Sequence, residues 1–183
     1  MTQILLTSFT TWMAHQQSNA SDDLLVEIQQ NYPSIGLHFL RQLPVDFQLA
    51  PEQAIAHFNQ LQPDAVILCG MAESRQKLTV ESRAITDDIL LHTRVNLEKL
   101  ITELEFTEIS HDAGQFVCEA LYHAMLKHLQ EAGLDCPCIF VHIPVLTSMN
   151  SQQIVKDFQA IVEYVRSETH YVNAKADMLK PHR

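Results

Sequence analysis

The stretch DAVILCG, from Asp64 to Gly70, is an apolar run that stops on a glycine. A short run of this continuous apolar character is typical of a strand buried on both faces of a parallel sheet. The segment before it, APEQAIAHFNQLQP (50–63), has Pro51 in a first helical turn and closes before Pro63, which predicts a helix. A helix that leads into a buried strand is the repeating unit of an α/β fold.

The same alternation extends in both directions from this stretch. We predict further strands at 3–9, 35–45, 77–86, 106–110 and 136–146, and further helices at 23–32, 95–105, 115–132 and 150–168. Strands separated by helices favour an α/β three-layer sandwich, with a mainly parallel (mixed) sheet flanked by helices on both faces. At 183 residues the chain predicts a single domain over 1–170 and a polar C-terminal tail over 171–183.

Charge and hydropathy restrict the partners. The formal net charge of −10 argues against nucleic acid or an anionic membrane surface, since both require a positive face. No apolar run approaches the roughly 18 residues of a membrane span. The N-terminal MTQILLTSF lacks the basic segment of a signal peptide, so a cytoplasmic location is expected. The sequence leaves homo-oligomerisation open.

Cofactor signatures are not apparent in the sequence. The four cysteines do not form a disulfide framework, and Cys136-Pro137-Cys138 is too tight for a typical zinc pair. The ten histidines show no paired-ligand spacing, and the four glycines are scattered rather than gathered in a phosphate-binding loop. We therefore expect no cofactor and no metal.

Three residues are candidates for chemistry because of where the predicted elements place them. Cys118 lies near the start of a helix, where unpaired N–H groups can lower a thiol pKa, although its position alone favours a buried structural cysteine. His142 ends a buried strand and can be a general base or a core histidine. Glu81 is a charge within an alternating stretch, either exposed or buried beside a partner such as an imidazole. Together they supply the nucleophile, base and orienting acid of a triad.

The motifs around these residues resemble those of the pyroglutamyl peptidases, also called pyrrolidone-carboxylate peptidases, which are cysteine peptidases. The resemblance rests on four segments and a weaker N-terminal one: AGQFVC (113–118), FVHIP (140–144), CGMAESR (69–75), VESRA (80–84) and LTSFTTW (6–12). It implies Cys118 as the nucleophile, His142 as the general base and acid, and Glu81 as the residue that orients His142.

The resemblance also implies a substrate pocket and a reaction. Phe9, Trp12, Asn19 and Met71 fall at substrate-binding positions, and the implied reaction is removal of an N-terminal pyroglutamyl group from a peptide. Glu119 stands where the family usually has asparagine, and the loop after Glu81 is short. These departures keep two alternatives open: a hydrolase of another small amide, or a catalytically impaired member that acts as a binding or structural protein.

Overall fold

The computed structural model describes residues 2–178, and its side chains as far as Thr169. Six strands form one mixed sheet in the order β2-β1-β3-β8-β4-β7. These strands are β1 (Ile4–Phe9), β2 (Leu37–Leu43), β3 (Ala65–Met71), β4 (Leu78–Glu81), β7 (Thr107–Ser110) and β8 (Cys138–Ile143). The predicted α/β fold with a mainly parallel sheet is therefore confirmed.

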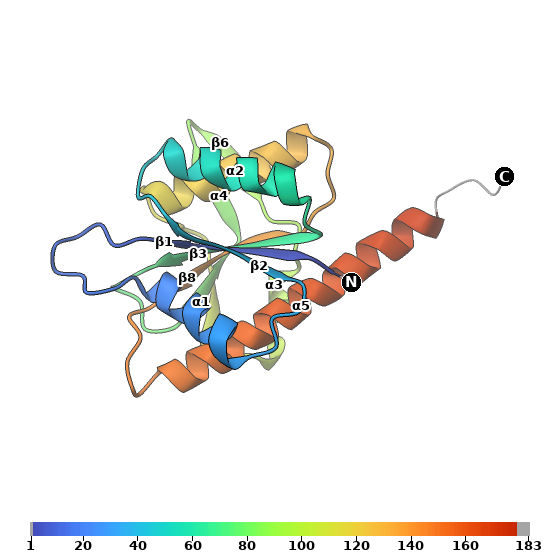
Figure 1. The fold of residues 1–183 in the computed structure, drawn as a ribbon. Helices are drawn as coiled ribbons and strands as arrows, with labels where there is room; N and C mark the ends of the chain where they lie inside the picture. The colour runs from blue at the N-terminus through green and yellow to red at the C-terminus, as the bar shows by residue number, and fades with distance from the viewer. Residues whose placement is uncertain (1, 179–183) are drawn as a thin grey trace.

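Helices cover both faces of this sheet. Helices α2 (Leu49–Leu61) and α4 (Val117–Glu131) pack on one face, and α1 (Ala20–Asn31), α3 (Leu97–Leu100) and α5 (Ser151–Met178) pack on the other (Figure 1). Every residue of β1, β4 and β8 is buried, as expected for strands covered on both sides. The apolar side chains form two clusters, one on each side of the sheet, which gives the three layers.

Strand β4 reverses the direction of the sheet. It pairs antiparallel with β8 and parallel with β7, whereas β1, β2, β3 and β8 all run the same way. Thr79 lies opposite His142 in this pairing, and Glu81 lies opposite Phe140. Glu81 therefore approaches His142 diagonally from the neighbouring strand, instead of from a shared carboxyl edge.

The predicted strand at 77–86 is two strands in different sheets. The chain breaks at Ser82, and β5 (Arg83–Thr86) then pairs with β6 (Ile89–His92) in a separate antiparallel hairpin over α4. Asp87 and Asp88 connect these strands with left-handed φ values of 51° and 62°. Two left-handed residues in a two-residue loop match the twist of a hairpin, and aspartate is among the residues that tolerate this conformation.

Two helices also differ from prediction. The helix predicted at 95–105 ends at Leu100 and continues as a 3₁₀ turn, η1 (Ile101–Glu103), where β-branched Ile101 and Thr102 disfavour the α-helix. Helix α5 runs on to Met178, past the tail boundary predicted at 170, and the part of that tail from 179 to 183 lies outside the described residues. Within the described part of the chain, no helix is long and apolar enough to cross a membrane.

Candidate active site

Cys118 is the second residue of α4, and its sulfur rests directly over Gly70 at the end of β3. A Cβ atom added to Gly70 would stand 2.7 Å from Cys118 Sγ and 2.8 Å from Phe140 Cζ. Only glycine leaves the space that the sulfur occupies, because real Cβ contacts essentially never come this close. The Asp112–Phe116 turn delivers the helix to this point, and Gly114 within it has a left-handed φ of 90°.

Burial keeps the thiol of Cys118 protonated. Desolvation raises the pKa of Cys118 to about 12, the negative charge of Glu81 adds to the rise, and the charge of Arg75 opposes it. The lowered pKa considered at the start of a helix is therefore wrong for Cys118, since loss of water outweighs the helix N–H groups at this half-buried position. A reaction at this sulfur requires a base to remove its proton.

His142 and Glu81 form a buried hydrogen-bonded pair. His142 Nδ1 lies 2.8 Å from Glu81 Oε1, and the two side chains are 5% and 0% exposed. Burial lowers the pKa of His142 more than the nearby carboxylate raises it, so the imidazole is neutral near pH 7. Because the carboxylate accepts a hydrogen bond from Nδ1–H, Nε2 is left as the basic nitrogen.

Arg75 bonds to the same carboxylate oxygen as His142. Its Nη1 donates to Glu81 Oε1 at 2.5 Å and also to Thr79 Oγ1, while Nη2 donates to the carbonyl oxygen of Asp112 at 2.8 Å. Burial raises the pKa of Glu81, but the hydrogen bond and charge of His142, with the bond from Arg75, hold that pKa below its ordinary value. Glu81 is therefore ionised in the folded protein at neutral pH.

The predicted triad residues and pocket residues surround one cavity of about 130 Å³, which we call the Cys118 cavity. Its lining includes all of the predicted positions except Glu81, which lies behind His142. The lining residues are Phe9, Trp12, Asn19, Val45, Met71, Ala113, Phe116, Val117, Cys118 and His142. A cavity of this size admits one small ring or side chain, whereas drug-sized ligands occupy roughly 300 Å³ or more.

Two of the predicted pocket residues hold helix α1 in place. Asn19 caps the helix, since its Oδ1 accepts from the Ser21 N–H at 3.0 Å and its Nδ2 donates to the Thr10 carbonyl oxygen at 3.0 Å. The sulfur of Met71 accepts from the Ala20 N–H at 3.2 Å. Both residues therefore shape the wall of the Cys118 cavity through their positions, and their polar atoms are already used.

Glu119 directs its carboxylate away from the cysteine. Its Oε1 accepts a hydrogen bond from the Ile85 N–H of the β5–β6 hairpin, and the residue is only 6% exposed. Burial raises the pKa of Glu119, and this bond partly opposes the rise. Glu119 thus anchors the β5–β6 hairpin to the start of α4.

Several residues at the site were not predicted from the sequence. Arg75, Thr79 and Tyr122 all contact Glu81, and the Tyr122 hydroxyl donates to the Glu81 carbonyl oxygen at 3.0 Å. Arg75 stands at the end of the CGMAESR motif, so its charge was a visible signal, but its partner was not. Phe116 was also missed, although it precedes the motif cysteine by only two residues.

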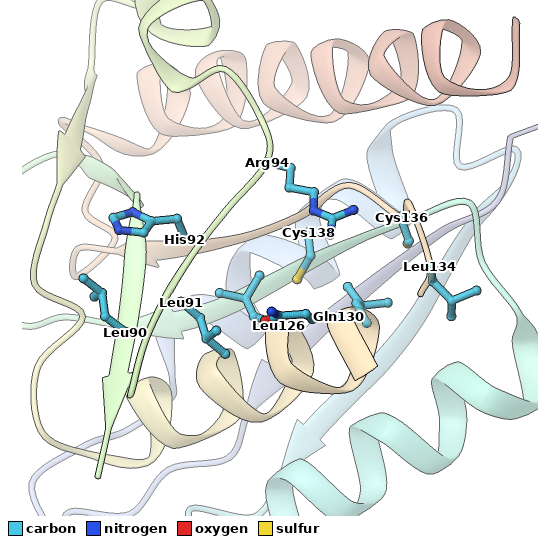
Figure 2. Close-up of a pocket in the computed structure, with 10 residues that line it drawn as sticks. Leu90, Leu91, His92, Arg94, Leu126, Gln130, Leu134, Cys136 and Cys138 are labelled. Atoms are coloured by element: carbon cyan, nitrogen blue, oxygen red, sulfur yellow. The ribbon is translucent and has the colours of Figure 1, made fainter. Parts of the chain in front are cut away.

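A separate cavity of about 280 Å³ lies between β6, the C-terminal half of α4 and the start of β8 (Figure 2). Leucine side chains and the cysteines Cys136 and Cys138 line it, together with Arg94 at its rim (Figure 2). All four cysteines are free, and burial raises the pKa of Cys136 to about 12. Among the side chains that the structure describes, no cluster of three or more histidine, cysteine or acidic residues could hold a metal ion.

The Cys118 cavity holds a thiol at the start of a helix and a neutral histidine, and a buried carboxylate lies behind the histidine. These are the groups of a cysteine-hydrolase site. No family model matches the chain. Curated relatives do match the chain. The pyrrolidone-carboxylate peptidase of Thermoanaerobacter sp. (strain X514) is 28% identical over 171 residues, which cover 79% of this chain and 83% of the relative.

A second pyrrolidone-carboxylate peptidase, from Halalkalibacterium halodurans, is 29% identical over 177 residues, covering 81% of this chain and 87% of the relative. The chain is thus similar over most of its length to the pyrrolidone-carboxylate peptidases, and the predicted resemblance is confirmed.

Solved structures share the fold. The pyrrolidone carboxyl peptidase from Thermococcus litoralis superposes with a TM-score of 0.81 at 17% identity, over 100% of both chains. The pyroglutamyl peptidase I from Bacillus amyloliquefaciens gives a TM-score of 0.77 at 18% identity, over 90% of this chain and 94% of its own.

Proposed function

We propose that this protein is a cysteine-type omega peptidase that removes an N-terminal pyroglutamyl group from peptides. The single observation that supports this most is the convergence of Cys118 and His142 on one small cavity, with His142 bonded to Glu81. The curated relatives bear the name of this activity and span most of the chain.

The proposed first step is general-base attack. His142 Nε2 takes the proton of the neutral Cys118 thiol while the sulfur attacks the pyroglutamyl carbonyl carbon, and the carbonyl π electrons move to oxygen. The first N–H groups of α4 have no partner within the helix and can stabilise this oxyanion. The ionised Glu81 stabilises the imidazolium that forms.

The second half returns the enzyme to its starting state. The imidazolium gives its proton to the leaving amine as the C–N bond breaks, which leaves a pyroglutamyl thioester on Cys118 and a shortened peptide. His142 then removes a proton from water, which attacks the thioester carbonyl. The C–S bond breaks to release pyroglutamate, and the sulfur recovers its proton from His142. No cofactor takes part in this scheme.

The lining of the Cys118 cavity suits a small, nearly planar lactam ring. Phe9 and Val45 offer apolar walls, and Trp12 and Phe116 stand at its mouth with rings 4.6 Å apart. An aromatic ring contributes large contact area without demanding a charged partner. We propose binding roles for Phe9 and Trp12 directly, and for Asn19 and Met71 through the shape that they give to the wall.

The test is hydrolysis of a pyroglutamyl fluorogenic amide by the wild type and by Cys118→Ala. We expect release of the fluorophore by the wild type only, and Cys136→Ala serves as a control that removes a thiol outside the Cys118 cavity. A wild type that releases no fluorophore, or a Cys118→Ala protein that retains activity, would contradict the proposal.

No specific structural observation favours either alternative, a hydrolase of another small amide or a catalytically impaired member that acts as a binding or structural protein. A panel of other aminoacyl amides, assayed beside the pyroglutamyl compound, identifies a hydrolase of another small amide. Binding of a pyroglutamyl peptide without turnover by the wild type identifies an impaired, binding member. A cytoplasmic location and a homo-oligomer stay predictions, which fractionation of cells and light scattering can test.

A further inference from the structure

A further cavity, which we call the hairpin cavity, adjoins the Cys118 cavity. It measures about 370 Å³ and shares Phe116 with the Cys118 cavity. Its walls come from the first turns of α4, the turn before that helix and the β5–β6 hairpin. The lining residues are Phe47, Ile85, Thr86, Asp87, Asp88, Gly114, Gln115, Phe116, Glu119 and Ala120.

Phe116 forms the partition between the two cavities. Its ring lies 4.6 Å from that of Trp12, over the Cys118 cavity, and 5.5 Å edge-on from that of Phe47, which lines the hairpin cavity. The Cys118 cavity is too small for more than the acyl ring, so the rest of a peptide substrate must continue past this partition. The hairpin cavity begins where that continuation starts.

The lining of the hairpin cavity combines exposed apolar and acidic side chains. Phe47 and Ile85 are 57% and 52% exposed, which leaves their apolar surfaces open to a ligand. Asp87 and Asp88 are exposed in the left-handed turn, and neither makes an ion pair with any residue that the structure describes.

Glu119 adds a buried acidic group to the same cavity. Its Oε1 accepts from the Ile85 N–H, and its Oε2 makes no hydrogen bond to any group that the structure describes. The residue is 6% exposed, and Oε2 is not among the fully buried oxygens without a partner, so it keeps contact with solvent. The charge of Arg83 lowers the pKa of Glu119, but the Arg83 Nε–H donates to the His111 carbonyl oxygen at 2.8 Å and not to Glu119. Acidic side chains that line a cavity and lack a cationic partner favour a cationic ligand group.

We propose that the hairpin cavity binds the residue that follows the pyroglutamyl group and selects lysine or arginine at that position. The stem of such a side chain packs on Phe47 and Phe116, and its cationic head lies near Asp87, Asp88 and Glu119. This inference rests on the proposed function, and it names the peptides on which that activity acts best.

The experiment compares three peptides, pyroglutamyl-Lys-amide, pyroglutamyl-Ala-amide and pyroglutamyl-Glu-amide. In the wild type at low salt we expect kcat/KM for the lysine peptide to exceed that for the alanine peptide by about fivefold, the effect of an ion pair at a partly exposed site. The glutamate peptide should react more slowly than either. High salt should weaken the lysine preference by screening.

The decisive variant is Asp87→Asn/Asp88→Asn, because asparagine keeps the left-handed turn and removes only the charges. The lysine preference, taken as the ratio of the two kcat/KM values in the same variant, should drop to about twofold or less. The matched control, Glu98→Gln/Glu103→Gln, removes two charges on the other face of the sheet and should leave the preference intact. An unchanged preference in the aspartate variant, or an equal loss in the control, would overturn the proposal.

A binding measurement separates this inference from the proposed function. Calorimetric titration of Cys118→Ala with the same three peptides needs no turnover. If Cys118→Ala binds the lysine peptide more tightly than the alanine peptide, and the added Asp87→Asn/Asp88→Asn change abolishes this difference, the hairpin cavity is supported. This holds even if the wild type hydrolyses none of the peptides, because that result rejects only the proposed activity. Equal binding of the lysine and alanine peptides rejects the inference even if both are hydrolysed.

Discussion

Gly70 and Cys118 are in direct contact, since the glycine at the end of β3 leaves the only space in which the cysteine sulfur rests. The contact joins the central sheet to the start of α4, and it fixes the height of the sulfur above the sheet. Phe140 closes the same space from β8, so the sulfur has little room to move.

Gly70→Ala should therefore disable the site. The added methyl group would stand 2.7 Å from the sulfur, so we expect at least a hundredfold loss of kcat/KM and a decrease of about 1–3 kcal/mol in the free energy of unfolding. Activity assays and urea denaturation measure both effects. Gly133→Ala, which meets no atom within 4 Å, should lose stability through its left-handed φ of 64° but keep its activity.

Glu81→Gln should lower the rate while preserving the shape of the site. A glutamine can hold His142 but cannot stabilise the imidazolium, so kcat should fall by about 10²–10⁴. Steady-state kinetics measure this loss, and Glu108→Gln on β7 is a surface control for removal of one charge. A kcat within threefold of the wild type would mean that Glu81 has no part in the reaction.

Arg75 should act through Glu81. Arg75→Met removes the ion pair of 2.5 Å from a half-buried position, and we expect a loss of about 1–3 kcal/mol of stability and a lower kcat with a similar KM. Arg75→Lys should recover part of both losses, because lysine restores the charge but lacks the fork that reaches Glu81 and the Asp112 carbonyl together. Equal losses in the two variants would contradict this role for the charge.

The pH dependence of activity should reflect the buried histidine. Burial places the pKa of His142 below its ordinary value of 6.5, so kcat/KM should remain high at pH 6.5 and fall only at lower pH. The unfolded state then binds the extra proton, so stability also decreases as the pH falls below 6.5. The lowered pKa of Glu81 adds a further loss below pH 4.5, the ordinary value for glutamate. An acid midpoint above 6.5 would refute the assignment of a neutral, buried His142.

Glu119 should matter more to the hairpin than to the thiol. Glu119→Ala removes the acceptor for the Ile85 N–H, so hydrogen exchange of that amide should speed up by about tenfold or more. Glu119→Gln keeps an acceptor oxygen and should preserve protection of the amide. In Glu119→Gln the rate at which iodoacetamide labels Cys118 should rise only slightly, because the charge of Glu119 is the smallest of the causes that raise the pKa of Cys118. A slow Ile85 amide in both variants would contradict the anchoring role.

The fold was predictable where local pattern suffices. Continuous apolar runs marked β1, β3 and β8, and helical spacing marked α1, α2 and α4. The direction of β4 was not predictable, because an apolar run carries no information on which way its strand runs beside β8. The hairpin turn at Asp87 was also missed, since its Asp-Asp pair lacks the glycine that usually marks such turns.

The site was predictable as a set of residues but not as an electrostatic environment. The motifs brought Cys118 and His142 to one cavity, yet the protonated state of the thiol depends on burial by segments distant in sequence. The contact of Arg75 with Glu81 likewise depends on tertiary structure, although both residues lay within quoted motifs. The outward direction of Glu119 follows from the 100° step between helix residues and needed only its partner in β5.

The pairing of β4 with β8 holds the carboxylate and the imidazole together through the backbone register of two adjacent strands. The segment from 83 to 92, which forms the β5–β6 hairpin, lies outside the six-stranded sheet and therefore has no part in setting their distance. Evolution can lengthen, shorten or replace that segment and alter the choice of substrate without rebuilding the chemistry. The β5–β6 hairpin is thus a place for protein engineers to exchange loops between relatives.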